Sequence, residues 1–304
     1  MPELPEVETV VRGLQGLRGK RVKSVDIRRP KLVSVGSKTL SPTRKHNVGH
    51  ARQFQKALVG RRVKDVRRRA KLIIFDLDAN WHLLVHLKMS GQIILKRRDQ
   101  RQIFVRLQNT PTAPLEALPS KHTHITIRFS NGTVLYYNDM RVFGTWRLVH
   151  ARDLSSLIDL SNYGPEPLER SFTWQKLRVA LLRRPRQKLK PALTDQTLLA
   201  GVGNIYADET LFRARLKPTR RVTSLTNADW QRLHRSLQYI LRFAIRTHGS
   251  SVGDYIRPDG SVGNFGKYHK VYDLKGQLCK RCGKPIKRIT LAGRGTHFCP
   301  NCQK

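Results

Sequence analysis

Two Cys-x-x-Cys pairs near the C-terminal end of the 304-residue chain carry the clearest chemical signal in its sequence. Cys279 and Cys282 form the first pair, and Cys299 and Cys302 form the second, with 16 residues between the pairs. Four thiolates at this spacing are typical of a zinc ribbon, in which the metal is bound tetrahedrally. Because every ligand is a cysteine, no coordination position stays open for a substrate. The sequence therefore predicts one structural Zn2+ ion, which stabilises a segment too short to bury a core of its own.

The first residues of the chain offer a different kind of chemistry. Pro2 follows Met1 directly, and the carboxylates of Glu3 and Glu6 come next. Removal of Met1 would expose a secondary amine with an ordinary pKa of about 7.7–8.0, so that a useful fraction is neutral near physiological pH. A neutral amine can attack an electrophilic carbon and form an iminium, while the carboxylates transfer protons. The same residues also suit the acidic first turn of an ordinary helix, so both interpretations stay open on local grounds.

The charge balance indicates a polyanionic partner. The chain has 59 Lys and Arg residues against 21 Asp and Glu residues, a formal net charge of +38 at pH 7. Such a surface repels itself unless a polyanion binds it, and nucleic acid is the first candidate and an anionic membrane the second. No apolar run approaches the roughly 18 residues that a membrane span needs, and the acidic start differs from the basic start of a secretory signal. We therefore expect a cytoplasmic protein that binds nucleic acid and does not enter the membrane.

Six separated segments resemble, in the same order, motifs of the formamidopyrimidine-DNA glycosylase/endonuclease VIII family. They are residues 2–8, 69–71, 86–91, 139–144, 190–207 and 293–299, and together with the cysteines they run through most of the chain. The resemblance implies a bifunctional DNA glycosylase and abasic-site lyase of base-excision repair. Such an enzyme would excise oxidised purines from double-stranded DNA through a Schiff base on its N-terminal proline, followed by β,δ-elimination. We expect it to act as a monomer.

The resemblance also implies catalytic roles for the residues that match. Pro2 would attack C1′ of the damaged nucleotide, Glu3 would act as general acid, and Glu6 would support the site. Lys71 and Arg294 would complete the catalytic set and bind DNA phosphates near the lesion. Without the resemblance, Lys71 would be an ordinary member of a basic run.

Further matches would hold the DNA itself. Lys190 and Asn204 correspond to the phosphate clamp of a helix–two-turn–helix motif. A base inside a duplex cannot be reached, so the nucleotide must be flipped out and the gap filled by side chains. The void-filling residues would be Met89, Arg141 and Phe143. On residue type alone Met89 and Phe143 also suit core packing, and this alternative stays open.

Two features favour the purine branch of the family, namely the retained Met/Arg/Phe set and the segment 249–267. This segment resembles the loop that covers an everted oxidised purine. Lys88, Met140 and Val142 depart from the family pattern close to the void-filling residues. Two alternatives are an oxidised-pyrimidine glycosylase of the endonuclease VIII branch and a lesion-binding protein without catalytic activity.

The elements that must position these residues predict a multidomain α+β fold. Residues 1–150 are expected to form an N-terminal catalytic β-sandwich with flanking helices. Residues 151–260 are expected to form a helical, helix–two-turn–helix DNA-binding domain. Residues 261–304 are expected to form a zinc-finger domain, a zinc-ribbon β-hairpin.

Local patterns add detail to this division. Apolar residues at helical spacing predict amphipathic helices over 5–17 and 227–248. The basic segment 36–55 and the proline-containing segment 109–121 are predicted to be loops or insertions. The segment 249–267, rich in Gly, Ser and Asp, is predicted to be a mobile loop.

Overall fold

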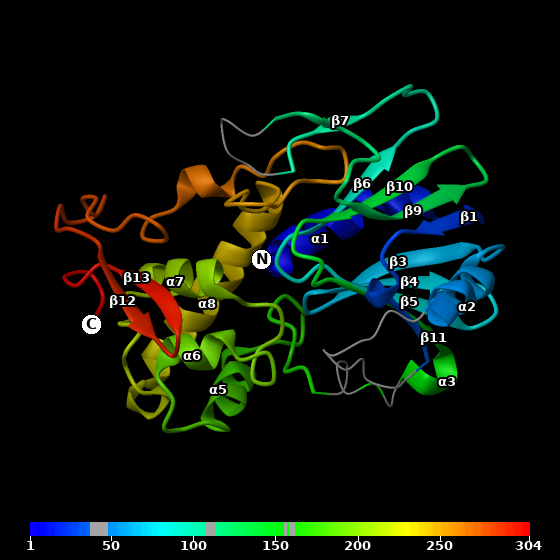
Figure 1. Cartoon of the computed structure of the whole chain (residues 1–304). Coiled ribbons are helices and arrows are strands. Elements are labelled where there is room, and N and C mark those ends of the chain that lie inside the picture. The colour runs from blue at the N-terminus through cyan, green and yellow to red at the C-terminus, as the bar shows by residue number, and fades with distance from the viewer. Residues whose placement is uncertain (37–47, 108–113, 155–156, 158–161) are drawn as a thin grey trace. The chain divides into compact units, whose positions relative to one another are not determined.

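The computed structural model describes residues 1–36, 48–107, 114–154, 157 and 162–304. The chain forms two compact units (Figure 1). The first, called the β unit, contains Met1–Pro2, Glu6–Ser161 and His248–Asn264. The second, called the helical unit, contains Glu3–Pro5, Asn162–Thr247 and Phe265–Lys304. The predicted division at residues 150 and 260 stays a prediction, and packing groups the segment 248–264 with the β unit.

The β unit is built on two mainly antiparallel sheets. The first sheet has the strand order β1 (Val22–Ile27), β9 (Thr123–Phe129), β10 (Val134–Asp139) and β6 (Gly91–Lys96). The second has the order β2 (Val33–Val35), β11 (Thr145–His150), β5 (Trp81–His86), β4 (Leu72–Leu77) and β3 (Val63–Arg69), with β2 and β11 parallel. A short pair, β7 (Phe104–Val105) and β8 (Glu116–Ala117), lies outside both sheets.

Helix α1 (Leu4–Gly13) supplies the apolar stripe that packs with the two sheets. Val7, Val10 and Val11 are buried in one core together with side chains from both sheets. The apolar residues recur every three to four positions, which is the spacing that puts them on one face of a helix. The other helices among the described residues of this unit are the 3-10 turns η1 (Gln15–Leu17) and η2 (Pro30–Leu32) and the helices α2 (Val48–Leu58) and α3 (Ala151–Leu154).

The helical unit contains the predicted helix–two-turn–helix motif. Its elements are α5 (Trp174–Leu182), α6 (Leu189–Thr194), α7 (Asn204–Arg213), η3 (Val222–Ser224), α8 (Asn227–Arg246), η4 (Phe265–Tyr268), β12 (Lys287–Leu291) and β13 (Arg294–Phe298). Two turns over residues 195–203 join α6 to α7. Helix α8 begins at a capping box, in which the side chains of Thr226 and Asp229 each accept a hydrogen bond from the other residue's backbone N–H. The predicted multidomain α+β fold, with N-terminal sheets, a helical domain and a C-terminal hairpin, is confirmed.

Several local predictions need correction. The helix expected over 5–17 ends at Gly13 and continues only as a 3-10 turn. Part of the segment 36–55, expected as a loop, is helical, because Ala51, Phe54 and Leu58 form an apolar stripe within a polar sequence and are buried. Residues 37–47 and 108–113 lie outside the described residues.

The segment 249–267 is also more than an open loop. Tyr255 and Ile256 are buried in cores of the β unit, and Ser250 forms an isolated β-bridge with Asn264. Apolar side chains at these two positions anchor a stretch whose composition is otherwise typical of a loop. Its mobility stays a prediction.

Candidate functional site

Glu3 lies at the N-terminus of α7, within the helical unit. Its side chain is only 3% exposed and accepts hydrogen bonds from the backbone N–H groups of Gly203 and Ile205, both at 2.9 Å. These N–H groups belong to the start of a helix, where unpaired amides and the helix dipole stabilise a negative charge. A Cβ atom at Gly203 would lie 2.3 Å from the carboxyl carbon of Glu3, so only glycine permits this approach. The carboxylate is thus fixed in position by backbone atoms.

Glu6 plays a comparable part within the β unit. It is 1% exposed, and its Oε1 atom accepts a hydrogen bond from the Ser250 N–H at 2.7 Å. Gly249 precedes that amide with φ +81°, a conformation that favours glycine, and a Cβ there would lie 2.8 Å from the same oxygen. Glu6 therefore links α1 to the segment 248–264. Pro2, four residues earlier, is also buried in this unit.

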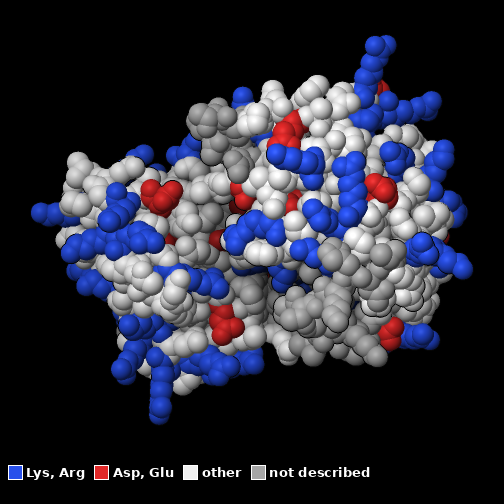
Figure 2. All heavy atoms as spheres, in the orientation of Figure 1, with Lys and Arg blue, Asp and Glu red and all other residues white. Residues whose placement is uncertain are grey.

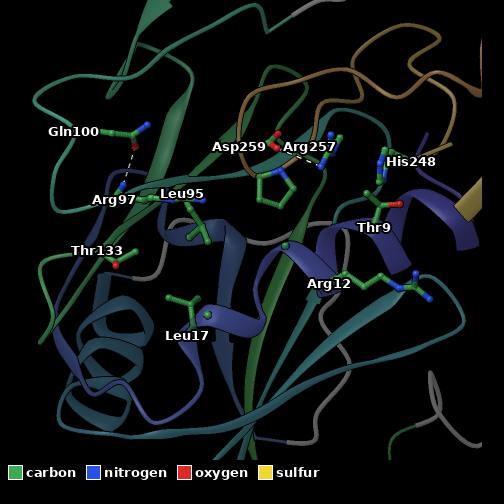
Figure 3. Close-up of a pocket in the computed structure, with 13 residues that line it drawn as sticks. Thr9, Arg12, Leu17, Leu95, Arg97, Gln100, Thr133, His248, Arg257 and Asp259 are labelled. Carbon is green, nitrogen blue, oxygen red and sulfur yellow. Dashed lines mark hydrogen bonds and ion pairs between the residues drawn. The ribbon is translucent and has the colours of Figure 1, made fainter. Parts of the chain in front are cut away.

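The segment 248–264 forms one wall of a pocket beside α1. This pocket has a volume of about 870 Å³ and is lined by residues from α1, the end of β6 and the turn around Pro258 (Figure 3). Gly13 lets the helix approach that turn closely, since a Cβ atom there would lie 2.8 Å from the Pro258 ring. None of the predicted site residues lines this pocket.

Lys71 lies at the tight turn between β3 and β4 and is buried. The preceding Ala70 has φ 53°, a left-handed conformation that sets the turn. Lys71 is close enough to His86 to act on it electrostatically: burial first, then the charges of Lys88 and Lys71, lower the pKa of His86 to about 3. His86 is thus neutral near pH 7, and its Nδ1 atom accepts a hydrogen bond from the Lys88 N–H.

The three predicted void-filling residues lie in two adjacent loops of the β unit. Met89 is in the β5–β6 loop, Arg141 and Phe143 are in the β10–β11 loop, and all three side chains are exposed. The pairing of β6 with β10 brings the two loops together. The guanidinium carbon of Arg141 lies 4.8 Å from the centre of the Phe143 ring. The core-packing alternative for Met89 and Phe143 does not fit their exposure.

Asp139, a fully buried carboxylate, fixes both of these loops. Its Oδ1 atom accepts a hydrogen bond from the Ser90 hydroxyl at 2.6 Å. Its Oδ2 atom accepts from the N–H groups of Phe143 and Gly144, at 2.9 and 2.8 Å. No role for Asp139 or Ser90 was predicted from the sequence, although both lie inside the matching motifs. A short polar residue at the end of an apolar strand was the available signal.

The four cysteines gather at one point of the helical unit. Their sulfur atoms all lie within 4.8 Å of one another, with 3.9 Å between Cys279 and Cys302 and 3.5 Å between Cys282 and Cys299. Tetrahedral zinc with Zn–S bonds of about 2.3 Å requires sulfur atoms roughly 3.8 Å apart, so the cluster fits the ion. The strands β12 and β13 form the hairpin that follows the first pair. The four residues form one structural zinc site.

Lys190 contacts the backbone of that hairpin at Gly295, the residue that follows Arg294. Arg294 opens β13 and is exposed. Lys190, from α6, is 1% exposed, and its Nζ atom donates a hydrogen bond to the Gly295 carbonyl at 2.7 Å. The same Nζ atom forms an ion pair with Asp208 of α7 at 2.7 Å. Lys190 thus holds the residue next to Arg294, rather than presenting its ammonium group on the surface.

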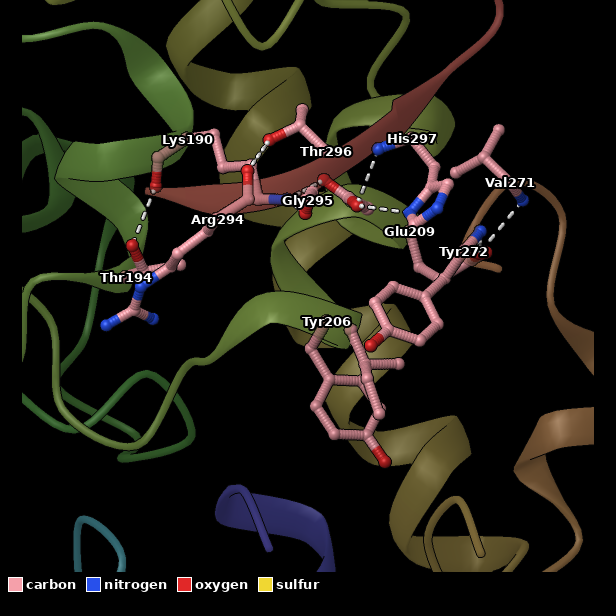
Figure 4. A network of polar contacts seen from close by, with 12 residues as sticks. Lys190, Thr194, Tyr206, Glu209, Val271, Tyr272, Arg294, Gly295, Thr296 and His297 are labelled. Atoms are coloured by element: carbon pink, nitrogen blue, oxygen red, sulfur yellow. Dashed lines mark hydrogen bonds and ion pairs between the residues drawn. The ribbon is translucent and has the colours of Figure 1, made fainter. Parts of the chain in front are cut away.

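Two neighbouring acids of α7 connect this helix to the ribbon (Figure 4). The Asp208 carboxylate accepts a hydrogen bond from the His297 N–H at 2.9 Å. The Glu209 carboxylate accepts from the N–H groups of Lys270, Val271 and Tyr272. Burial raises the pKa of Glu209, and these three N–H groups oppose that change. No role for Asp208 was predicted from the sequence.

The predicted site residues therefore fall into two groups. The β unit contains Pro2, Glu6, Lys71, Met89, Arg141 and Phe143. The helical unit contains Glu3, Lys190, Asn204, Arg294 and the four cysteines, and Asn204 is the first residue of α7. Figure 2 shows Lys and Arg side chains spread widely over the visible face, with few acidic ones between them. Among the described residues, no helix is both long and apolar enough to cross a bilayer.

Family models match three parts of the chain. They are the formamidopyrimidine-DNA glycosylase N-terminal domain over residues 1–146, the helix–two-turn–helix domain of the same enzyme over 163–255, and a zinc finger found in that enzyme and in isoleucyl-tRNA synthetase over 276–304. The order of the three models is the order of the predicted sandwich, motif and ribbon.

Whole-length relatives agree with the family models. The formamidopyrimidine-DNA glycosylase of Heliobacterium modesticaldum is 39% identical to the chain, and the match covers 100% of both proteins. That of Pelotomaculum thermopropionicum is 37% identical, over 100% of the chain and 99% of the relative. The Lactococcus lactis enzyme, solved with DNA containing an abasic site, is similar with 35% identity, a TM-score of 0.81 and 99% coverage of each chain. The same enzyme with DNA containing Fapy-dG gives 35% identity, a TM-score of 0.81 and coverage of 99% and 100%. The chain belongs to the formamidopyrimidine-DNA glycosylase family of DNA-repair enzymes.

Proposed function

We propose that the chain is a bifunctional DNA glycosylase that removes oxidised purines from double-stranded DNA and then cleaves the strand at the resulting abasic site. The observation that carries the proposal is the environment of Glu3. This carboxylate adjoins Pro2 in the sequence, is buried, and is held by the first amides of α7. A fixed carboxylate next to an N-terminal secondary amine is the arrangement that covalent amine catalysis needs.

The proposed chemistry begins when Met1 has been removed and the Pro2 nitrogen attacks C1′ of the damaged nucleotide. The new C–N bond forms as the bond from C1′ to the base breaks, and the departing base takes up a proton from water. Glu3 takes the proton released by the attacking amine and passes it to the ring oxygen O4′, so that the sugar opens and an iminium remains. Loss of a C2′ proton then eliminates the 3′ phosphate, and a second elimination removes the 5′ phosphate.

The remaining site residues would hold the distorted DNA. Met89, Arg141 and Phe143 are exposed on two loops fixed by Asp139, which suits side chains that fill the space of a flipped nucleotide. Lys71, Asn204 and Arg294 would bind phosphates. For Lys190 we propose a positioning role, because its ammonium group is buried between Asp208 and the Gly295 carbonyl. It would act through Arg294, and we propose that the enzyme works as a monomer.

Oxidised pyrimidines form a second candidate substrate class. One solved structure of the Lactococcus lactis enzyme, 35% identical to this chain, contains DNA with an oxidised pyrimidine. Both lesion classes therefore belong in one assay. Duplexes with 8-oxoguanine, a formamidopyrimidine or an oxidised pyrimidine would be compared by single-turnover base release. We expect faster release of the purine lesions, and a strong preference for the pyrimidine would contradict the assignment.

The covalent mechanism is tested by trapping the iminium. Wild-type protein and lesion duplex are mixed with sodium borohydride, and the covalent adduct is measured on a denaturing gel. We expect an adduct that peptide mapping assigns to the Pro2 nitrogen. Pro2→Gly should weaken trapping, and protein that retains Met1 should give none.

Val179→Ala is the matched control, because Val179 is 68% exposed and lies on α5, a helix that contains no predicted site residue. It should trap at the wild-type rate. Wild-type protein that binds the lesion duplex tightly but yields no adduct would favour the alternative of a lesion-binding protein without catalysis.

A further inference from the structure

The helical unit has an aromatic pocket that the proposed chemistry does not use. It has a volume of about 370 Å³ and lies between α7, α8, η4 and the first cysteine knuckle. Phe243 of α8 is at its centre, with ring centroids 5.0 Å from Tyr268, 5.8 Å from Phe265 and 6.1 Å from Tyr239. A volume of this size accommodates one nucleobase or an aromatic group of similar bulk.

Two tyrosine rings of this pocket are open to solvent. Tyr239 is 44% exposed and Tyr268 is 45% exposed, although each packs against the partly buried ring of Phe243. Phe243 itself packs on the buried Phe265 and fixes the two tyrosine rings, so they lose little freedom when a planar ligand stacks on them. The exposed rings therefore offer a rigid stacking surface.

The border of the pocket is positively charged. It includes Arg213, Lys270, Lys280 and Arg281. The Arg213 guanidinium carbon lies 3.5 Å from the centre of the Tyr239 ring, and that of Arg281 lies 4.3 Å from the centre of the Phe212 ring. Among the described residues that line the pocket, Glu209 is the sole acid, and its carboxylate is buried and occupied by three backbone N–H groups. The ligand that complements this pocket is aromatic and carries negative charge.

We propose that this pocket binds single-stranded DNA, with one base stacked among Tyr239, Tyr268 and Phe243 and the flanking phosphates on the cationic border. Aromatic rings interleaved with Arg and Lys side chains bind single strands without regard to sequence, because every base has a face to stack. An acidic peptide with an aromatic residue would share part of this chemistry. It would gain no backbone pairing here, since no described lining residue belongs to a strand. The proposal does not depend on the chemistry of Pro2.

The test first occupies the predicted lesion-binding site. Full-length zinc-loaded protein is saturated with a duplex that contains a tetrahydrofuran abasic analogue, and fluorescein-labelled (dT)8 is then added. We expect a second, saturable rise in anisotropy on the protein–duplex complex. Tyr268→Ala and Tyr239→Ala should each weaken binding of (dT)8 on the order of tenfold. No binding to the complex, or binding by both variants as tight as that of the wild type, would overturn the proposal.

A control variant and a crosslinking measurement locate the binding of (dT)8 on the protein. Phe104→Ala is the control for loss of an exposed ring, because Phe104 is 58% exposed and belongs to the β unit, and it should bind (dT)8 normally. A (dT)8 strand with one 5-iodouracil should crosslink in the wild type to a peptide that contains Tyr239 or Tyr268, which needs no folded variant. Crosslinks confined to other peptides, or tighter binding of an acidic Glu-Glu-Glu-Phe peptide than of (dT)8, would refute the assignment.

Discussion

A buried carboxylate needs hydrogen-bond donors, and for Glu3 and Glu6 those donors are backbone amides beside glycines. Gly203 lies against Glu3, and Gly249 precedes the amide that binds Glu6. In both places the missing side chain makes room for the acid. Because an added methyl group cannot be accommodated without moving the carboxylate, these glycines control the geometry of the proposed active site.

Gly203→Ala tests this idea for Glu3. The new Cβ atom would lie 2.3 Å from the carboxyl carbon of Glu3, so the carboxylate must shift. Displacement of a catalytic group by about 1 Å can cost roughly 100-fold in rate. We expect a loss of about that size in single-turnover base release, with little change in duplex affinity. Gly16→Ala is the control, since its added Cβ meets nothing within 4 Å. Equal rates for the two variants would remove Gly203 from the mechanism.

At the scale of elements, periodic and motif-bearing segments were predictable, and contacts between distant segments were not. The Asn-Gly hairpin at 131–132, helix α8 and the cysteine ribbon follow from local pattern, because turn chemistry, apolar spacing and ligand spacing act over few residues. Helix α2 was missed because its buried apolar residues, Ala51, Phe54 and Leu58, are interspersed with polar ones.

The residues of the candidate site were predictable from the sequence, whereas the contacts that fix them in position were less so. The exposed Met89, Arg141 and Phe143 lie in motifs that the sequence shows. The hydrogen bond by which Asp139 holds Ser90 depends instead on strand pairing between β6 and β10. Lys190 was expected to bind a phosphate. Its burial against Asp208 arises from the packing of α6, α7 and β13, which no local pattern encodes.

The ion pair of Lys190 with Asp208, which joins α6 to α7, leads to a prediction about stability. Burial lowers the pKa of Lys190 while Asp208 opposes that shift, so Asp208→Asn leaves a poorly compensated buried charge. We expect that variant to lose about 3–5 kcal/mol of unfolding free energy. The double variant Lys190→Met with Asp208→Asn keeps an acceptor for the His297 N–H and removes both charges, so it should recover most of the loss. Denaturant unfolding measures both values.

The salt dependence of duplex binding separates the two roles of Lys190. If Lys190 acts through position, the stable double variant should keep the wild-type slope of log K against log salt. A slope lower by about 1 would show instead that Lys190 neutralises a phosphate directly.

The whole molecule carries a net charge of +38, far more than a few phosphate contacts require. Lys and Arg side chains are spread over the visible surface rather than restricted to the predicted contacts (Figure 2). Long-range attraction from so many charges raises the rate of encounter with DNA and the affinity for any sequence. Selectivity for damage must then arise from the few fixed groups, because the general attraction is the same for intact DNA.

Removal of zinc tests how much of the electrostatic attraction to DNA comes from the basic residues of the folded ribbon. Between its two cysteine pairs the ribbon carries Arg294 and three further basic residues, Lys284, Lys287 and Arg288, on a segment that depends on the metal for its folding. We expect Arg294→Ala to reduce the slope of log K against log salt by about 1, and chelation of zinc to reduce it further, because all of these contacts are lost together. The remaining slope should stay steep, since most of the 59 basic residues lie outside the ribbon. Titrations of lesion and intact duplex at several salt concentrations measure this. If chelation changed the slope no more than Arg294→Ala does, the ribbon would act through that single side chain, and its other cations would be solvated charges without a phosphate partner.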